Sequence, residues 1–193
     1  MQSVCVFCGS SPGGRPEYRA AAEALGAEIA QQGLTLVYGG GRVGLMGVVA
    51  DAALAQGGKV IGVLPESLST HELRHDGLTE LHIVGSMHER KALMAERADA
   101  FVALPGGFGT LDEMCEILTW TQLGIQRKPC GILNVLGFFD PLLSLFDHAV
   151  AERFLSREHR ALVLEETEPA RLLECLRESP TPPLPKWLDR EER

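Results

Sequence analysis

Short hydrophobic runs alternate along this chain with segments whose apolar residues recur at helical spacing. Each run is followed by a turn, glycine-rich in the clearest cases, and then by an amphipathic segment. Runs this continuously apolar predict parallel strands that are buried on both faces, with helices covering each side. The alternation therefore favours an α/β fold: a single domain with a Rossmann-like, doubly wound parallel sheet.

The predicted elements can be placed by residue range. Strands are expected at 3–8, 34–38, 59–64, 100–104 and 130–135, with weaker candidates at 81–84 and 162–164. Helices are expected from about 16 to Gly33, from the second glycine cluster to about 56, and at about 87–98, 110–123 and 141–153. Residues 1–178 are thus predicted to form the domain, and the proline-rich residues 179–193 an extended tail.

Composition and charge narrow the function classes. The 193 residues carry a formal net charge of −8, which argues against nucleic acid or an acidic membrane surface as partner. The N-terminal residues do not resemble a signal peptide, and no stretch is long and apolar enough to span a bilayer, so we expect a cytoplasmic protein. The five cysteines are expected to be reduced, and the odd separation of Cys5 and Cys8 should place them on opposite sheet faces.

Three glycine clusters each follow a strand and precede a helix, so they should meet at the carboxyl edge of the sheet. Glycine lets an anion approach the free N–H groups of a helix start, which predicts a phosphate site. The candidate phosphate-binding residues are Gly9, Ser10, Gly40, Gly41, Gly107, Gly109 and Thr110. The G-x-G-x-x-G of Gly39, Gly41 and Gly44 is weak evidence for a dinucleotide, because Glu66 lies behind a proline rather than at a strand end.

Two groups of charged residues stand beside apolar helix faces. Arg90 and Lys91 flank the stripe of Met87, Met94 and Ala98, which indicates either a buried anionic partner or snorkelling side chains. Thr110 and Glu113 fit the S/T-x-x-E capping box, the reading that the pattern alone favours, while the position of Glu113 beside an apolar face also suits acid/base chemistry.

A literal H-E-x-x-H occurs at His71 to His75. Zinc hydrolases need this motif on a helix together with a third ligand, whereas here Pro65 and Gly77 leave room for only about two turns. A surface loop or short helix over the cleft is the alternative interpretation. A zinc hydrolase based on His71 and His75 stays open as a rival, and the favoured interpretation assigns no metal.

The motifs M-H-x-R-K at 87–91 and P-G-G-x-G-T-x-x-E at 105–113, together with Gly39–Gly41 and Thr119, resemble the LOG (Lonely Guy) family. The resemblance runs from Val4 to about Arg177. Members of that family are cytokinin riboside 5′-monophosphate phosphoribohydrolases, usually homodimers with the site near the subunit interface. An older label of lysine decarboxylase in the family finds no support here, because no lysine has the context of a pyridoxal Schiff base.

The resemblance assigns particular roles to residues of this chain. Arg90 and Glu113 would be the catalytic pair. The implied substrate contacts are Glu72, Arg90, Lys91, Gly107, Phe108, Gly109, Thr110, Leu111, Asp112, Glu113 and Thr119. No cofactor is implied.

The implied reaction splits the N-glycosidic bond of an N6-substituted adenosine 5′-monophosphate, releasing free base and ribose 5-phosphate. Glu113 would stabilise the oxocarbenium-like state and take a proton from water, while Arg90, which stays charged, would orient Glu113 or the substrate. Two alternatives within reach of the same site are an AMP nucleosidase with AMP as main substrate and a non-catalytic nucleotide-binding module.

Overall fold

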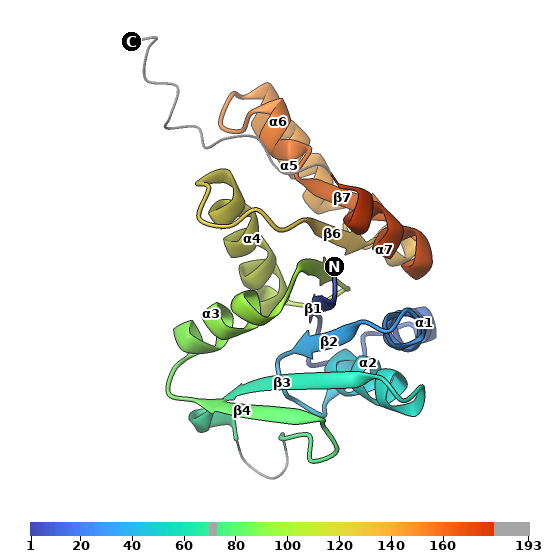
Figure 1. The fold of residues 1–193 in the computed structure, drawn as a ribbon. Coiled ribbons are helices and arrows are strands. Elements are labelled where there is room, and N and C mark those ends of the chain that lie inside the picture. Colours follow the sequence, from blue (N-terminus) through green and yellow to red (C-terminus); the bar gives the residue numbers. More distant parts are fainter. Residues whose placement is uncertain (70–72, 180–193) are drawn as a thin grey trace.

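A parallel sheet forms the centre of the protein (Figure 1), and the computed structural model describes residues 1–69 and 73–179. Within these residues the strands lie in the order β4-β3-β2-β1-β5-β6-β7, and every neighbouring pair is parallel. The strands are β1 (Ser3–Phe7), β2 (Thr35–Tyr38), β3 (Lys59–Pro65), β4 (Glu80–Val84), β5 (Ala100–Ala103), β6 (Cys130–Leu133) and β7 (Val163–Glu166).

Helices cover both faces of the sheet. The longer helices are α1 (Pro16–Gln31), α2 (Gly44–Ala55), α3 (Met87–Arg97), α4 (Phe108–Gln122), α5 (Asp140–Ala151) and α7 (Pro169–Glu178), with short pieces at η1 (Glu66–Leu68), η2 (Val135–Gly137) and α6 (Arg157–Arg160). Helices α1, α2 and α7 pack on one face, whereas α3, α4 and α5 pack on the other.

Alternate residues of each central strand divide between two hydrophobic cores. Val4 and Val6 of β1 join the core under α1, α2 and α7, whereas Cys5 and Phe7 join the core under α3, α4 and α5. All four side chains are nearly or fully buried, which explains why the strands read as continuous apolar runs. Cys8 lies with the first core, so the prediction that Cys5 and Cys8 occupy opposite faces is confirmed.

The strand order places a topological switch point at the centre of the sheet. From β1 the chain proceeds through β2, β3 and β4 to one edge, and then returns to add β5 on the other side of β1. Connections from β1 and β5 therefore leave in opposite directions, and a crevice opens at their carboxyl ends. Two backbone hydrogen bonds tie the loops there, from the N–H of Gly9 to the carbonyl of Pro105 at 3.1 Å and from the N–H of Leu45 to the carbonyl of Gly9 at 3.0 Å.

The predicted strands are all present, the last of them as Val163–Glu166. Three expectations about helices and strands need correction. The strand expected to reach residue 135 ends at Leu133, the helix expected from Thr110 begins at Phe108, and α7, whose Leu172, Leu173 and Leu176 pack in the core, was not expected. The predicted tail lies outside the described residues beyond Ser179. Among the helices of the described ranges, none has the length and apolar character that crossing a membrane requires.

Candidate active site

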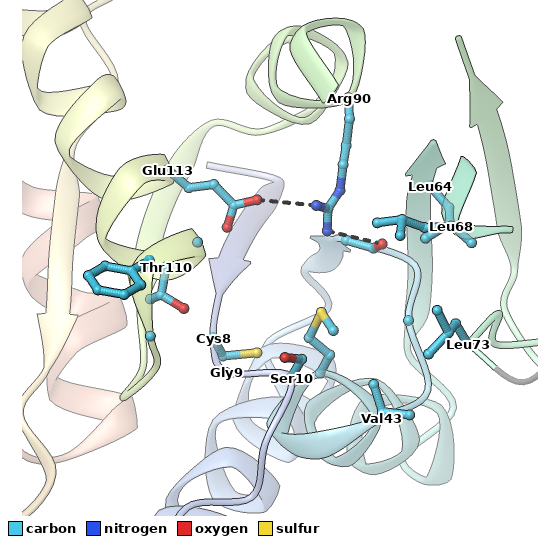
Figure 2. Close-up of a pocket in the computed structure, with 16 residues that line it drawn as sticks. Cys8, Gly9, Ser10, Val43, Leu64, Leu68, Leu73, Arg90, Thr110 and Glu113 are labelled. Atoms are coloured by element: carbon cyan, nitrogen blue, oxygen red, sulfur yellow. Dashed lines mark hydrogen bonds and ion pairs between the residues drawn. The ribbon is translucent and has the colours of Figure 1, made fainter. Parts of the chain in front are cut away.

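A cavity of about 640 Å³ opens at the switch point, which is the size range of small-molecule sites. Its walls come from the loops after β1, β2 and β5, the end of β3, and the starts of α2 and α4 (Figure 2). The lining residues are Cys8, Gly9, Ser10, Gly39, Gly41, Val43, Met46, Leu64, Leu68, Leu73, Arg90, Gly107, Phe108, Gly109, Thr110 and Glu113.

Arg90 reaches into the cavity from α3 and is fixed by backbone carbonyls of the sheet. Its Nε donates to the carbonyl of Val63 at 3.1 Å, and its Nη2 donates to the carbonyl of Gly39 at 3.2 Å. The remaining Nη1 lies 3.3 Å from the sulfur of Met87, which is partly exposed rather than core-facing, and 3.7 Å from Oε1 of Glu113. The guanidinium is therefore held rigidly, with one edge turned towards Glu113 (Figure 2).

Glu113 faces Arg90 from one turn inside α4 (Figure 2). Only 12% of either side chain is exposed. Burial raises the pKa of the Glu113 carboxyl above its usual value, against the opposing effect of the Arg90 charge. A carboxylate with a raised pKa beside a fixed cation, at the wall of a cavity, can accept a proton or stabilise a developing positive charge.

Helix α4 begins in the cavity wall. Gly107 is its N-cap residue with no side-chain capping bond, so the predicted capping box of Thr110 and Glu113 is wrong. Thr110 instead lies three residues inside the helix, where its side chain is buried against Gly106. The first N–H groups of α4, at Phe108, Gly109 and Thr110, have no partner within the helix and offer donors at its positive end. This is a site suited to an anion.

The other two glycine clusters contribute unequally. Gly9, Ser10 and Gly41 line the cavity, whereas Gly40 lies behind it with a φ of +74°, and its carbonyl accepts a hydrogen bond from the N–H of His75. Gly44 also has a positive φ, +60°, and its Cα passes so close to the backbone of Ser10 that a Cβ would collide with it. The glycines here serve close backbone packing as much as contact with a ligand.

An apolar wall faces the polar side of the cavity. Leu64, Leu68 and Leu73 lie opposite Thr110 and Glu113 (Figure 2), and Val43 and Met46 extend this lining. Sequence reasoning did not find these residues. Leu64 could have been found from its position at a strand end, but Leu68 and Leu73 give no such signal because they come from η1 and the following loop.

Several residues expected to contact substrate lie outside the cavity lining. Lys91 is paired with Asp112 and Glu116, and Leu111 packs against the core. Thr119 donates a hydrogen bond to the carbonyl of Cys115 and lines a separate groove between α4 and α5. The lining of the main cavity therefore contains neither Lys91, Leu111, Asp112 nor Thr119.

The H-E-x-x-H segment is only partly described. His71 and Glu72 lie outside the described residues, whereas Leu73 to Gly77 form turns and a short bridge to Gly41. Both ring nitrogens of His75 are engaged, since Nδ1 accepts from the N–H of Gly77 at 3.1 Å and Nε2 lies 3.0 Å from Asp51. Within the described ranges, the His, Cys, Asp and Glu side chains form no group of three that could hold a metal ion.

The fold and the cavity together define a Rossmann-like protein with a glycine-rich anion site and a buried Arg–Glu pair. The family model described as "Possible lysine decarboxylase" matches residues 46–176. The chain is also 54% identical over 164 residues to the cytokinin riboside 5′-monophosphate phosphoribohydrolase of Rhodococcoides fascians, covering 84% of this chain and 83% of that protein. A relative of the same name in Arabidopsis thaliana, LOG7, is 48% identical over 178 residues, covering 92% and 82%.

The chain therefore belongs to the LOG family. Among solved structures, the molybdenum cofactor binding protein of Rippkaea orientalis has a TM-score of 0.70 at 25% identity, covering 92% of this chain and 96% of that one. The molybdenum cofactor carrier protein of Chlamydomonas reinhardtii gives 0.68 at 22% identity, covering 91% and 95%, which shows the shared fold.

The lysine decarboxylase description does not fit the positions of the lysines. Lys59 is exposed at the start of β3, Lys91 is paired with two carboxylates, and Lys128 donates to the carbonyl of Ala95. None of these described lysines lines the cavity, so none is placed to form a Schiff base with a ligand there.

Proposed function

We propose that the protein hydrolyses the N-glycosidic bond of adenosine 5′-monophosphates, with N6-substituted nucleotides as substrates, to give free base and ribose 5-phosphate. The observation that carries this proposal is the buried Arg90–Glu113 pair, which stands between the N–H donors of α4 and an apolar wall. A nucleoside monophosphate presents the matching sequence of groups: phosphate, ribose and base.

The phosphate would bind at the start of α4. Backbone N–H groups at Phe108, Gly109 and Thr110 supply donors at the positive end of the helix dipole, next to the N-cap residue Gly107, with Gly9 and Ser10 on the facing loop. Arg90 is occupied by two carbonyls, so it is not the main phosphate ligand. Its role is to contribute fixed positive charge beside Glu113 and the ribose.

The ribose would then lie against Glu113. Cleavage of a glycosidic bond passes through an oxocarbenium-like state, which the carboxylate stabilises before it takes a proton from the attacking water. The bond from the anomeric carbon to the base nitrogen breaks with its electron pair leaving on the base, and water supplies the new C–O bond. The released base gains one proton overall, which balances the proton that Glu113 takes from the water. The ionised carboxylate is the active form, so the rate falls as the pH drops through the raised pKa of Glu113.

The base and its N6 substituent would point to the apolar wall. Leu64, Leu68 and Leu73 offer a surface that an isopentenyl group would cover, whereas plain AMP would leave it exposed to water. This feature favours N6-substituted substrates over an AMP nucleosidase that prefers AMP itself.

We further propose that the protein acts as a homodimer in the cytoplasm. Phe108 at the cavity mouth is 93% exposed and Phe154 beside the α4–α5 groove is 84% exposed, and a partner subunit would cover these apolar side chains. Thr119 lines that groove and not the cavity of its own subunit. If Thr119 contacts substrate, it would therefore do so in the cavity of the partner subunit. All five cysteines are free thiols, as expected in a reducing compartment. Phe154→Asp should yield monomers in light scattering if the groove is the interface.

The decisive test is base release by Glu113→Gln. The variant keeps the shape of the side chain, so it should bind AMP like the wild type while losing about 10²- to 10⁴-fold in turnover of N6-isopentenyladenosine 5′-monophosphate. Retained turnover would disprove the role of Glu113. Wild-type protein that binds AMP and releases no base from either nucleotide would be a binding module, and activity lost to a chelator would favour the zinc alternative.

A further inference from the structure

A second ion-pair cluster joins α3 and α4 behind the Arg90–Glu113 pair. Lys91, the neighbour of Arg90 on α3, places its Nζ 3.0 Å from Oε2 of Glu116 and 3.2 Å from Oδ2 of Asp112. Asp112 and Glu116 stand on α4 immediately before Glu113 and one turn after it. Helix α3 therefore directs Arg90 into the cavity and helix α4 directs Glu113. The neighbouring residues Lys91, Asp112 and Glu116 bind the two helices to each other.

Lys91 faces the contact between α3 and α4 rather than the cavity. It is absent from the cavity lining, whereas Arg90 and Glu113 belong to it. Burial by itself lowers the pKa of Lys91, but hydrogen bonds to Glu116 and Asp112 outweigh it, and the pKa is raised. The ammonium is thus kept charged and committed to two carboxylates, one of which, Glu116, is itself 26% exposed.

The Arg90–Glu113 separation needs an external constraint. Arg90 is anchored to the sheet through Val63 and Gly39, whereas Glu113 is carried by α4. Their 3.7 Å contact is longer than a hydrogen bond, so the pair does not fix its own spacing. The ion pairs of Lys91 with Asp112 and Glu116 link α3 to α4 next to this pair, and they fix the distance between Arg90 and Glu113.

We propose that Lys91 is a positioning residue of the reaction: through Asp112 and Glu116 it holds α3 against α4 and balances the negative charge beside Glu113. This inference rests on the proposed function, because it assigns Lys91 a part in the same hydrolysis. It replaces the expectation that Lys91 contacts the substrate.

The charge balance gives the inference a distinctive signature. Titratable groups from three parts of the fold act on or lie against Glu113. They are Arg90 and Lys91 from α3, Asp112 and Glu116 from α4, and Cys5 of β1 with Cys8 just after it. Burial raises the pKa of both thiols, which keeps them neutral. Lys91 lowers the pKa of Glu113, whereas Asp112 and Glu116 raise it. Loss of Lys91 and loss of Glu116 should therefore move the pKa of Glu113 in opposite directions.

The experiment measures kcat, KM and the pH profile of base release from N6-isopentenyladenosine 5′-monophosphate. Lys91→Met should lower kcat by about tenfold to a hundredfold with little change in KM, and should move the acid limb of the profile to higher pH. Lys91→Arg should restore most of the rate, because it keeps the charge. Glu116→Gln should move the acid limb to lower pH. Lys59→Met, which removes an exposed lysine at the start of β3, is the matched control.

Other outcomes would overturn the inference. A raised KM with unchanged kcat and an unmoved acid limb in Lys91→Met would show that Lys91 contacts the substrate. If Lys91→Met does not fold, the pH profile of Glu116→Gln becomes the test. An acid limb that stays where it is in the wild-type profile would then refute the charge balance. Wild-type protein that releases no base would instead refute the proposed function, and with it this inference, before any variant is compared.

Discussion

Gly39→Ala should disable the site without unfolding the protein. Gly39 follows β2 directly, and a Cβ added to it would lie 1.8 Å from Nη2 of Arg90, although an ordinary contact begins at 3.4 Å. The guanidinium must then retreat by about 1.6 Å. Because Gly39 does not have a positive φ, alanine suits the backbone, and the collision falls on the end of one long side chain.

The size of the effect follows from what Arg90 loses in that retreat. Its Nη2 bond to the carbonyl of Gly39 and its Nε bond to the carbonyl of Val63 define its place, and its Nη1 faces Glu113. A misplacement of about 1 Å in a catalytic constellation costs on the order of a hundredfold. We therefore expect kcat to fall about a hundredfold, which corresponds to about 2.7 kcal/mol of transition-state stabilisation.

The assay compares base release, AMP affinity and melting temperature for wild type, Gly39→Ala and Gly14→Ala. Gly14 is the control, since a Cβ there meets open space and its φ also suits alanine. Affinity for AMP should stay within a few-fold of wild type, because the start of α4 is unchanged. Full activity in Gly39→Ala would refute the assignment of Arg90, and activity lost only in proportion to unfolding would show that Gly39 serves stability alone.

Three further predictions concern stability and specificity. Gly44→Ala should lower the melting temperature, because its φ of +60° and a Cβ only 2.2 Å from the carbonyl carbon of Ser10 force the backbone apart; thermal denaturation measures this. Leu73→Ala should raise KM for the N6-isopentenyl nucleotide about tenfold while leaving KM for AMP nearly unchanged, as steady-state kinetics would show. Glu113→Gln should melt at a higher temperature than wild type, with a gain that grows as the pH rises from the unfolded pKa of the carboxyl through its raised folded pKa. Folding raises the pKa of Glu113. The contribution of the protonated carboxyl to stability is therefore present below the unfolded pKa and is lost as the pH rises through the folded pKa. A gain in melting temperature that does not depend on pH would contradict this reasoning.

Most of the fold could be predicted because its strands are buried on both faces. Continuous apolar runs such as Val4 to Phe7 predict a parallel sheet, and the glycines after them mark its carboxyl edge. The start of α4 could not be placed in the same way. Thr110 and Glu113 satisfy a capping pattern, but the side chain of Thr110 is packed tightly against Gly106, and the N-cap is Gly107, three residues before Thr110.

The sequence predicted the charged residues of the site but not its apolar wall, for a physical reason. Arg90 and Glu113 belong to compact local motifs, so their sequence neighbours identify them. The apolar wall joins Leu64, Leu68 and Leu73 with residues of α2, and only the order of β1, β2 and β3 brings them together. Likewise, the separation of Arg90 from Lys91, with one facing the cavity and the other facing Asp112, depends on where α4 lies against α3.

Binding and chemistry are assigned to different kinds of group in this cavity. Backbone N–H donors at the start of α4 can hold a phosphate whatever side chains they carry, provided that these leave room. The Arg90–Glu113 pair instead depends on two separate anchors, the sheet carbonyls for Arg90 and helix α4 for Glu113. Substitutions that obstruct the glycine loops should therefore act mainly on KM, whereas those that shift either anchor should act on kcat. Gly39 is the informative exception: it lies in a glycine loop, yet its missing side chain makes room for Arg90, so its substitution should behave kinetically as a change to the pair.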